Sequence, residues 1–408
     1  MDASAYRTSY RKTIGLAAVA LVVAAIGAIG LVQGEVSILR WVLSGIAALL
    51  AAFAAAVVAG GLFCLRREAN QERGIGWMPR PNVRNRSARE SAVRRAIRVG
   101  DRVEVRSAEE IMATLDAAGT LEALPFMPEM LAYCGKRFSV SNRADKILDM
   151  IDKTGLRRMR RAAFLDDVRC DGSAHDGCQQ GCRIIWKTSW LRRVQPGSPE
   201  PEPGADTTAF GAQLQPFVRR SDSEDREEPL YRCQATELLA ASTRMHHWDP
   251  RAELRALATG NVRLGDFVLV LSMRAFNFVQ ELRGGSRYPA YTPSCRGKTP
   301  QERLDLYPGE WVEVKSLREI EATLGAEGRN RGMRFDREMV RYCGGRYRVR
   351  SRVDRLIDEK TGRMLVLRNP CIVLEGVETP GEFLRFNPQR EFPYWREIWL
   401  RRVSERSN

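Results

Sequence analysis

One stretch of this chain occurs twice, at residues 100–140 and again at 309–349. The first copy opens with Gly-Asp-Arg-Val-Glu-Val-Arg-Ser and the second with Gly-Glu-Trp-Val-Glu-Val-Lys-Ser. Both copies then contain Tyr-Cys-Gly, and both end on Trp-x3-Trp-Leu-Arg-Arg-Val at the same offset. Repetition at a constant offset predicts two domains of one fold, over residues 100–194 and 309–403.

Short strands are expected within each copy. Residues 102–105 alternate Arg-Val-Glu-Val, which is the period of a strand with one buried face. Ser107 followed by Glu110 is a capping box, which predicts a short helix. Short strands joined by brief helical turns favour a small β-barrel of SH3-like type in each copy, in an α+β or mostly β fold class. Further strands are expected at 137–140, 156–165 and 182–194, with the paired tryptophans in the core or, alternatively, as a stacking platform.

Two uncharged segments precede the repeats. Residues 14–32 and 42–65 contain no charged side chain, and each is about as long as a helix that crosses a bilayer. Only Gln33–Trp41 separates them, so the sequence predicts an N-terminal two-helix transmembrane hairpin over residues 1–65. A cleaved signal peptide is the alternative for the first segment.

Positive charge follows the second uncharged segment. Residues 66–98 hold ten Arg against three Glu, within a chain whose net charge is +15. The positive-inside rule then predicts that 66–99 is a basic juxtamembrane segment, that both termini are cytoplasmic, and that the protein lies in the bacterial inner membrane. The same charge is compatible with anionic lipid headgroups, an acidic protein or nucleic acid as partner.

The pattern Cys170-x4-His175-x2-Cys178-x3-Cys182 is the one cluster in the sequence that points to a specific chemistry. In a reducing compartment, cysteines are thiols or metal ligands. Four such ligands within a loop of small residues match a tetrahedral structural zinc site. An iron–sulfur cluster, free cysteines and redox-active thiols are the alternatives.

The second copy has no such cluster, because neither Cys nor His occurs at the corresponding place. The metal is therefore expected to serve the first repeat alone. Cys134 and its repeat partner Cys343 are expected to be small buried hydrophobic residues.

Between the repeats, residues 195–229 are rich in Pro, Gly, Ser and acidic residues, which predicts a disordered linker. Residues 230–308 are expected to form a helical segment. Asp249-Pro250 should start one helix that ends at Gly260, and residues 263–283 follow the helical period.

Several phrases of the two repeats resemble a family of bacterial proteins with no established activity. They are Leu-Pro-Phe-Met-Pro-Glu-Met at 124–130 with Tyr-Cys-Gly at 133–135, Arg-Cys-Asp-Gly at 169–172 with His175 and Cys178-Gln179, and Pro-Tyr-Trp-Arg-Glu-Ile-Trp-Leu at 393–400. The resemblance covers about residues 97–404 and implies no mechanism. Its members also tend to carry cysteines late in the second repeat, where this chain has Glu378 and Asn387.

These features favour a membrane-anchored cytoplasmic binding or scaffolding protein with a structural zinc site in its first repeat. The alternatives are a metal- or iron–sulfur-dependent redox or enzyme accessory protein, and a membrane-tethered nucleic-acid-binding protein. No nucleophile–base pair, helical metalloprotease motif or dinucleotide-binding loop is present, so the sequence does not predict an enzyme.

Overall fold

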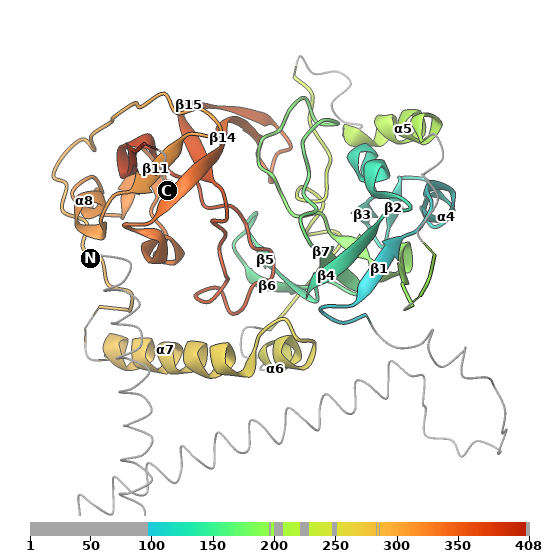
Figure 1. Cartoon of the computed structure of the whole chain (residues 1–408), viewed down its shortest axis with the longest axis horizontal. Coiled ribbons are helices and arrows are strands. Elements are labelled where there is room, and N and C mark those ends of the chain that lie inside the picture. The colour runs from blue at the N-terminus through green and yellow to red at the C-terminus, as the bar shows by residue number, and fades with distance from the viewer. Residues whose placement is uncertain are drawn as a thin grey trace, which may run out of the picture.

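The computed structural model describes residues 97–404, except 196, 200–206, 221–227, 247–250, 283 and 285. Each copy of the repeat forms its own sheet around its own hydrophobic core, and the two copies lie side by side (Figure 1). The elements of the first repeat are β1 (Arg102–Val105), α4 (Ala108–Met112), β2 (Thr120–Leu121), β3 (Leu124–Pro125), η2 (Pro128–Tyr133), β4 (Arg137–Arg143), β5 (Lys146–Asp149), β6 (Gly155–Arg158), β7 (Ala162–Leu165), β8 (Trp186–Lys187), η3 (Thr188–Trp190) and β9 (Leu191–Arg193).

The main sheet of the first repeat has the strand order β8-β7-β4-β1-β9. β1 lies between two antiparallel partners, with Val103 opposite Phe138 of β4 and opposite Arg193 of β9. Val103 and Val105 are fully buried, as the alternating pattern predicts. A hairpin of β5 and β6 continues beyond β4 and pairs with β10 (Thr243–Arg244).

The second repeat builds the same arrangement 209 positions later. Its sheet has the order β15-β14-β11-β16, and an isolated bridge between Ile372 and Trp395 takes the place of the β7–β8 pairing. β14 and β15 are long, so their far ends form the hairpin that β5 and β6 form in the first repeat. The elements are β11 (Trp311–Val314), α8 (Leu317–Glu321), β12 (Arg329–Asn330), β13 (Met333–Arg334), η6 (Arg337–Tyr342), β14 (Arg346–Ile357), β15 (Met364–Leu374), η7 (Glu397–Trp399) and β16 (Leu400–Arg402).

Both cores are organised around aromatic side chains, which confirms the prediction made for the tryptophans. Phe126 packs edge-on against Trp186 and Trp190, with ring centroids 6.4 and 5.3 Å away. The second repeat repeats this cluster with Phe335, which lies 6.4 and 5.3 Å from the rings of the tryptophans at 395 and 399. Edge-to-face geometry is the favourable arrangement for buried rings. The predicted capping box of Ser107 and Glu110 is also present.

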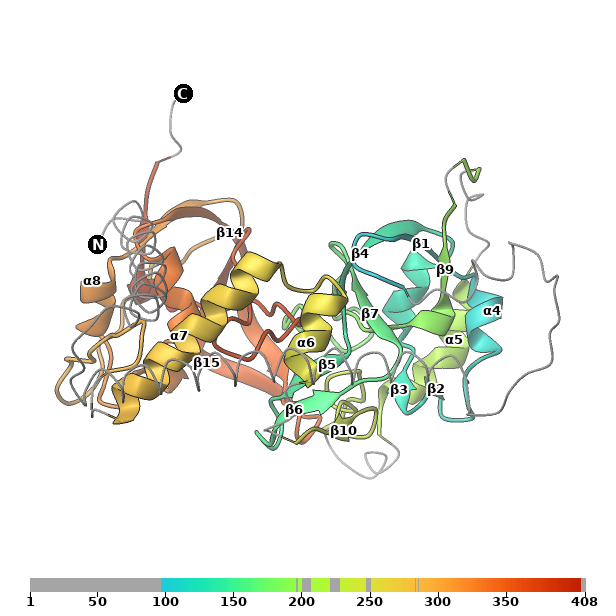
Figure 2. The ribbon, with the colours of Figure 1, turned by 90° about the horizontal axis from the view of Figure 1, so that it is seen from below.

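Two helices lie along one side of the molecule, α6 (Arg251–Ala258) and α7 (Leu264–Leu282) (Figures 1 and 2). They correspond to the helices expected after Asp249 and over 263–283. Phe267 of α7 stacks on Phe386 at a centroid distance of 5.4 Å, so the helix packs against the second repeat.

Part of the predicted linker is folded. Residues 208–218 form α5 (Thr208–Leu214) and η4 (Gln215–Val218), and Leu214 and Val218 are buried. Leu214 packs into the core of the first repeat, whereas Val218 contacts a cluster that includes Ile357 of β14. Composition alone does not reveal these contacts.

The predicted fold class requires correction. No helix in the described part of the chain is long and apolar enough to cross a membrane. Its longest helix, α7, has 19 residues and carries Asp266, Arg274 and Glu281. The predicted spans 14–32 and 42–65 lie outside the described residues. The structure thus does not support a transmembrane hairpin, an integral membrane partner or a place in the inner membrane.

The SH3-like type of the two repeats is not part of this correction and stays a prediction. In each repeat the first strand pairs with the last, β1 with β9 and β11 with β16, and a 3-10 turn precedes that last strand. What the structure supports is a chain of mostly β-sheet with few helices.

Candidate metal centre

The predicted ligands lie in a closed loop, residues 170–182, which we call the ligand loop. The amide of Cys170 donates to the carbonyl of Cys182 at 2.9 Å, and Arg169 and Arg183 form an antiparallel bridge at its base. Gly172 has φ +71°, and a Cβ there would lie 1.9 Å from the carbonyl oxygen of Cys178. Only glycine fits this position, which lets the loop fold back on itself.

Three donor atoms from two segments meet beside this loop. A carboxylate oxygen of Glu129, the sulfur of Cys170 and a ring nitrogen of His175 all lie within 4.8 Å of one another. The Cys170 thiol donates to Glu129 Oε1 at 3.0 Å, and His175 Nδ1 lies 3.3 Å from the same oxygen. Carboxylate, thiolate and imidazole are ordinary ligands of divalent metals. This triad can hold a metal ion.

The orientation of His175 suits such a role. Its Nε2 lies 3.2 Å from the carbonyl oxygen of Arg232, which only accepts, so Nε2 carries the hydrogen. In the neutral ring Nδ1 then presents a lone pair to the carboxylate of Glu129. Both Nδ1 of His175 and Oε2 of Glu129 are buried without a hydrogen-bond partner. A metal-bound histidine commonly donates its other ring N–H to a backbone carbonyl in this way.

The charge of Glu129 also favours a cation at this site. Burial favours the neutral imidazole, but the carboxylate of Glu129 outweighs it and raises the pKa of His175 above its ordinary value. The pocket therefore favours a positive charge next to Glu129, which either a proton or a metal ion can supply.

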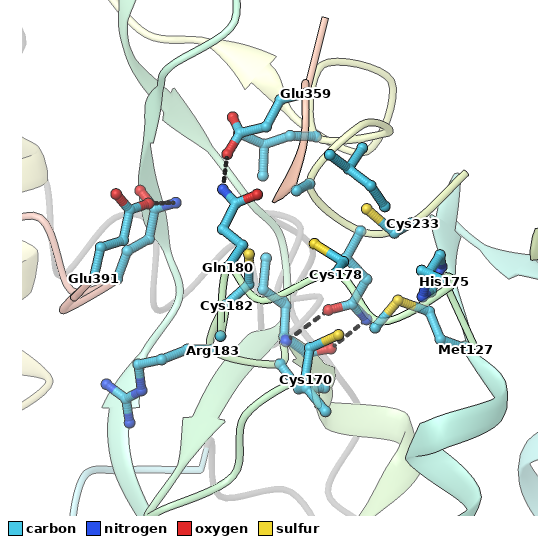
Figure 3. A pocket seen from close by; sticks show the side chains of 18 of the residues that line it. Met127, Cys170, His175, Cys178, Gln180, Cys182, Arg183, Cys233, Glu359 and Glu391 are labelled. Atoms are coloured by element: carbon cyan, nitrogen blue, oxygen red, sulfur yellow. Dashed lines mark hydrogen bonds between the residues drawn. The ribbon is translucent and has the colours of Figure 1, made fainter. Parts of the chain in front are cut away.

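The other predicted ligands, Cys178 and Cys182, lie outside the triad but close to it. Together with Cys170, His175 and Cys233 they line a cavity of about 60 Å³ (Figure 3). Within the described part of the chain, no three of these cysteine sulfurs come within 4.8 Å of one another. The structure thus gathers all four predicted residues around one cavity without bringing them to one point.

Glu129 and Cys233 are the ligand candidates that sequence reasoning missed. Glu129 lies on η2, 41 positions before Cys170, in a segment whose sequence indicates core packing and not metal binding. Cys233 follows the predicted linker and has no counterpart in any motif. One available signal was that both repeats keep the same acidic residue, as Glu129 and Glu338.

Burial keeps the cavity thiols protonated when no cation is present. It raises the pKa of Cys170, Cys178 and Cys182, and it raises the pKa of Cys233 to about 12. A metal cation reverses this preference by stabilising the thiolates. These cysteines are therefore poorly suited to act as free nucleophiles at neutral pH.

The second repeat keeps the backbone of the ligand loop without its ligands. Gly381 stands where the first repeat has Gly172, with φ +76° and a built Cβ 2.3 Å from the carbonyl oxygen of Asn387. The positions of the four predicted ligands are held by Thr379, Leu384, Asn387 and Glu391. The loop geometry thus does not depend on a metal, so the ligand residues of the first repeat need another explanation.

The two loops contact each other where the repeats meet. Arg169 pairs with Glu378, its counterpart 209 positions later, at 2.7 Å, and lies 3.7 Å above the ring of Phe392. Arg169 also donates at 2.8 Å to the carbonyl oxygen of Gly181 and to that of Arg390, which is the repeat counterpart of Gly181. Equivalent residues of the two repeats contact each other, which is expected when the repeats are related by an approximate two-fold axis.

Each loop also reaches the hairpin of the other repeat. The side chain of Gln179 accepts from the amides of Asp354 and Arg355 at 2.7 and 3.1 Å, and Gln389 accepts from the amide of Leu148 at 2.7 Å. Residues of the second repeat therefore complete the walls of the cavity, namely Ile357, Glu359, Gln389 and Glu391.

No protein-family model, curated protein or solved structure matches this chain.

Proposed function

We propose that the protein is a binding or scaffolding protein whose two repeats are held in one arrangement by a metal centre between them. The observation that carries this proposal is the meeting of Glu129, Cys170 and His175 at a cavity whose walls come from both repeats. A cation there offsets the buried carboxylate and thiolate, and it ties η2 and the ligand loop together.

Two kinds of metal cofactor suit this donor set. A single zinc ion would take the triad as three ligands and leave one position for Cys178, Cys182 or water. An iron–sulfur cluster would take the cysteines that line the cavity. Either cofactor would stabilise the contact between the repeats, because the ligand loop is hydrogen-bonded to β14 through Gln179.

The proposed partner is an acidic protein surface. Arg346, Arg348 and Arg350 alternate along β14, and all three are exposed. Residues two apart on a strand share one face, so Arg346 and Arg348 lie together, and Arg350 follows them at a register shift of the strand. We call these three exposed arginines the basic row. Such a row attracts carboxylates, with an affinity that falls as salt is added.

The metal part of the proposal is tested by hydrogen exchange of the full-length chain before and after chelation. Removing the metal should speed exchange at the amides of Asp354 and Arg355, which donate to the ligand loop, and leave Val103 in the first core protected. Unchanged exchange at both loop-contacting amides, in a protein shown to have lost its metal, would refute a metal that holds the repeats together.

The partner class is tested with polyglutamate and double-stranded DNA as probes. Replacing Arg348 and Arg350 by Gln should weaken polyglutamate binding, whereas Arg160→Gln, an exposed arginine of the first repeat, should not. Tighter binding of DNA than of polyglutamate by the native chain would replace the acidic protein with nucleic acid as the partner.

A further inference from the structure

The spread of the cysteines around the cavity limits how many of their sulfurs a single metal ion could bind. With Zn–S bonds of about 2.3 Å, a tetrahedral zinc ion holds its sulfur ligands about 3.8 Å apart. Within the described residues, no three of Cys170, Cys178, Cys182 and Cys233 have sulfurs within 4.8 Å of one another. They nevertheless face one cavity, so a cofactor with several metal atoms fits them better than a single ion.

Cys233 is held in place by its neighbour in the chain. The side chain of Gln234 accepts from the amide of Ile185 at 2.8 Å and donates to the carbonyl oxygens of Ile185 and Pro125 at 2.9 and 3.1 Å. These three bonds fix residues 233–234 against the first repeat, beside the ligand loop. Cys233 is therefore part of the cavity wall even though the predicted linker separates it from the loop in sequence (Figure 3).

The rest of the cavity suits a buried cluster. Apolar side chains form much of its wall, among them Ile184, Ile185 and Leu238, and these exclude water. The charged side chains of the wall are Arg183, whose guanidinium points away from the cysteines (Figure 3), and two glutamates. Burial raises the pKa of both Glu359 and Glu391 and so favours their neutral forms.

We propose that this cavity holds an iron–sulfur cluster whose four thiolate ligands are Cys170, Cys178, Cys182 and Cys233. The inference rests on the metal centre proposed above and names its cofactor. Cys170 then binds as its thiolate, and Glu129 and His175 lie directly beside this ligand.

The test is the iron, acid-labile sulfide and zinc content of the full-length chain, purified without oxygen and then incubated with ferrous iron and sulfide. The native chain should contain iron and sulfide in similar amounts and show broad visible absorbance. Cys233→Ser should lose most of both, whereas Cys295→Ser, which alters a cysteine outside the cavity, should keep them.

The results that would contradict the iron–sulfur cluster differ from those that would contradict any metal centre. One zinc per native chain, retained in Cys233→Ser and lost in Glu129→Gln, would overturn the cluster and leave the proposed metal centre standing. Absence of any metal from the native chain after reconstitution would overturn both. If Cys233→Ser fails to fold, the iron-to-sulfide ratio and the electron paramagnetic resonance spectrum of the reduced native chain still decide between cluster and zinc.

Discussion

Glu129 and Glu338 occupy equivalent positions in the two repeats but have different partners. Glu129 accepts from the Cys170 thiol at 3.0 Å and faces His175 Nδ1, whereas Glu338 accepts from the backbone amides of Gly381 and Phe383 at 3.0 and 3.1 Å. The second repeat therefore satisfies its carboxylate with its own loop, and the first leaves one oxygen of Glu129 without a hydrogen bond. This difference within one chain supplies matched controls for the metal centre.

Replacing each glutamate by glutamine should separate the two roles. Glu129→Gln removes the charge beside Cys170 and should weaken metal binding by about 10- to 100-fold, as losses beside metal ligands do. Glu338→Gln should leave metal affinity unchanged, because no cysteine or histidine of the cavity contacts it. Competition with a chelator of known affinity measures both variants, and equal losses in the two would show that Glu129 has no special relation to the metal.

Glu338 should make stability depend on pH. Its burial raises the carboxyl pKa from 4.5 to about 7, despite the two amides that donate to it. The folded state therefore binds this proton more tightly than the unfolded state does. The associated stabilisation is present below pH 4.5 and is lost as pH rises towards 7, by at most about 3 kcal/mol.

Denaturant unfolding of the native chain and Glu338→Gln at pH 5 and pH 8 checks this linkage. The glutamine cannot ionise, so the variant should gain stability relative to the native chain at the higher pH. A difference between the two proteins that stays constant across this range would contradict the raised pKa.

Two glycines of the ligand loop allow the cost of backbone strain to be measured separately from the cost of a steric clash. Gly172 and Gly177 both have positive φ, but a Cβ on Gly172 would meet the carbonyl oxygen of Cys178, whereas a Cβ on Gly177 has nothing within 4 Å. Gly177→Ala should cost about 1–2 kcal/mol, the strain of a left-handed residue. Gly172→Ala should cost more and should also lower metal content. Thermal unfolding and metal analysis of both variants test this, and equal effects would argue against the tight turn at Gly172.

Arg169 should be sensitive even to a change that keeps its charge. Its guanidinium contacts Glu378, Gly181, Arg390 and the ring of Phe392 at once, which the single ammonium of lysine cannot do. Arg169→Lys should destabilise the protein by about 2 kcal/mol. Arg192→Lys is the control, since its side chain is 52% exposed and its ion pairs contribute little. Denaturant unfolding should therefore show a clear loss only for the first variant.

Local structure was largely predictable from the sequence. The alternation in β1, the capping box at Ser107 and the helical period of α7 each depend on residues close together in the chain, and all three are present in the structure. The repeat itself was visible because two copies of one pattern can be compared within a single chain. The predicted membrane architecture, by contrast, has no support among the described residues.

The four spaced ligands of the loop were visible for the same reason, since Cys170 and Cys182 are only twelve positions apart. The duplicated pattern, the local elements and the presence of soft ligands in one copy can all be read from neighbouring residues. The positions of Glu129 and Cys233 beside these ligands, and the closing of the cavity by the second repeat, follow only from the folded chain. These contacts join residues that are distant in the chain, so they depend on how the repeats and the segment between them pack, which no local pattern encodes.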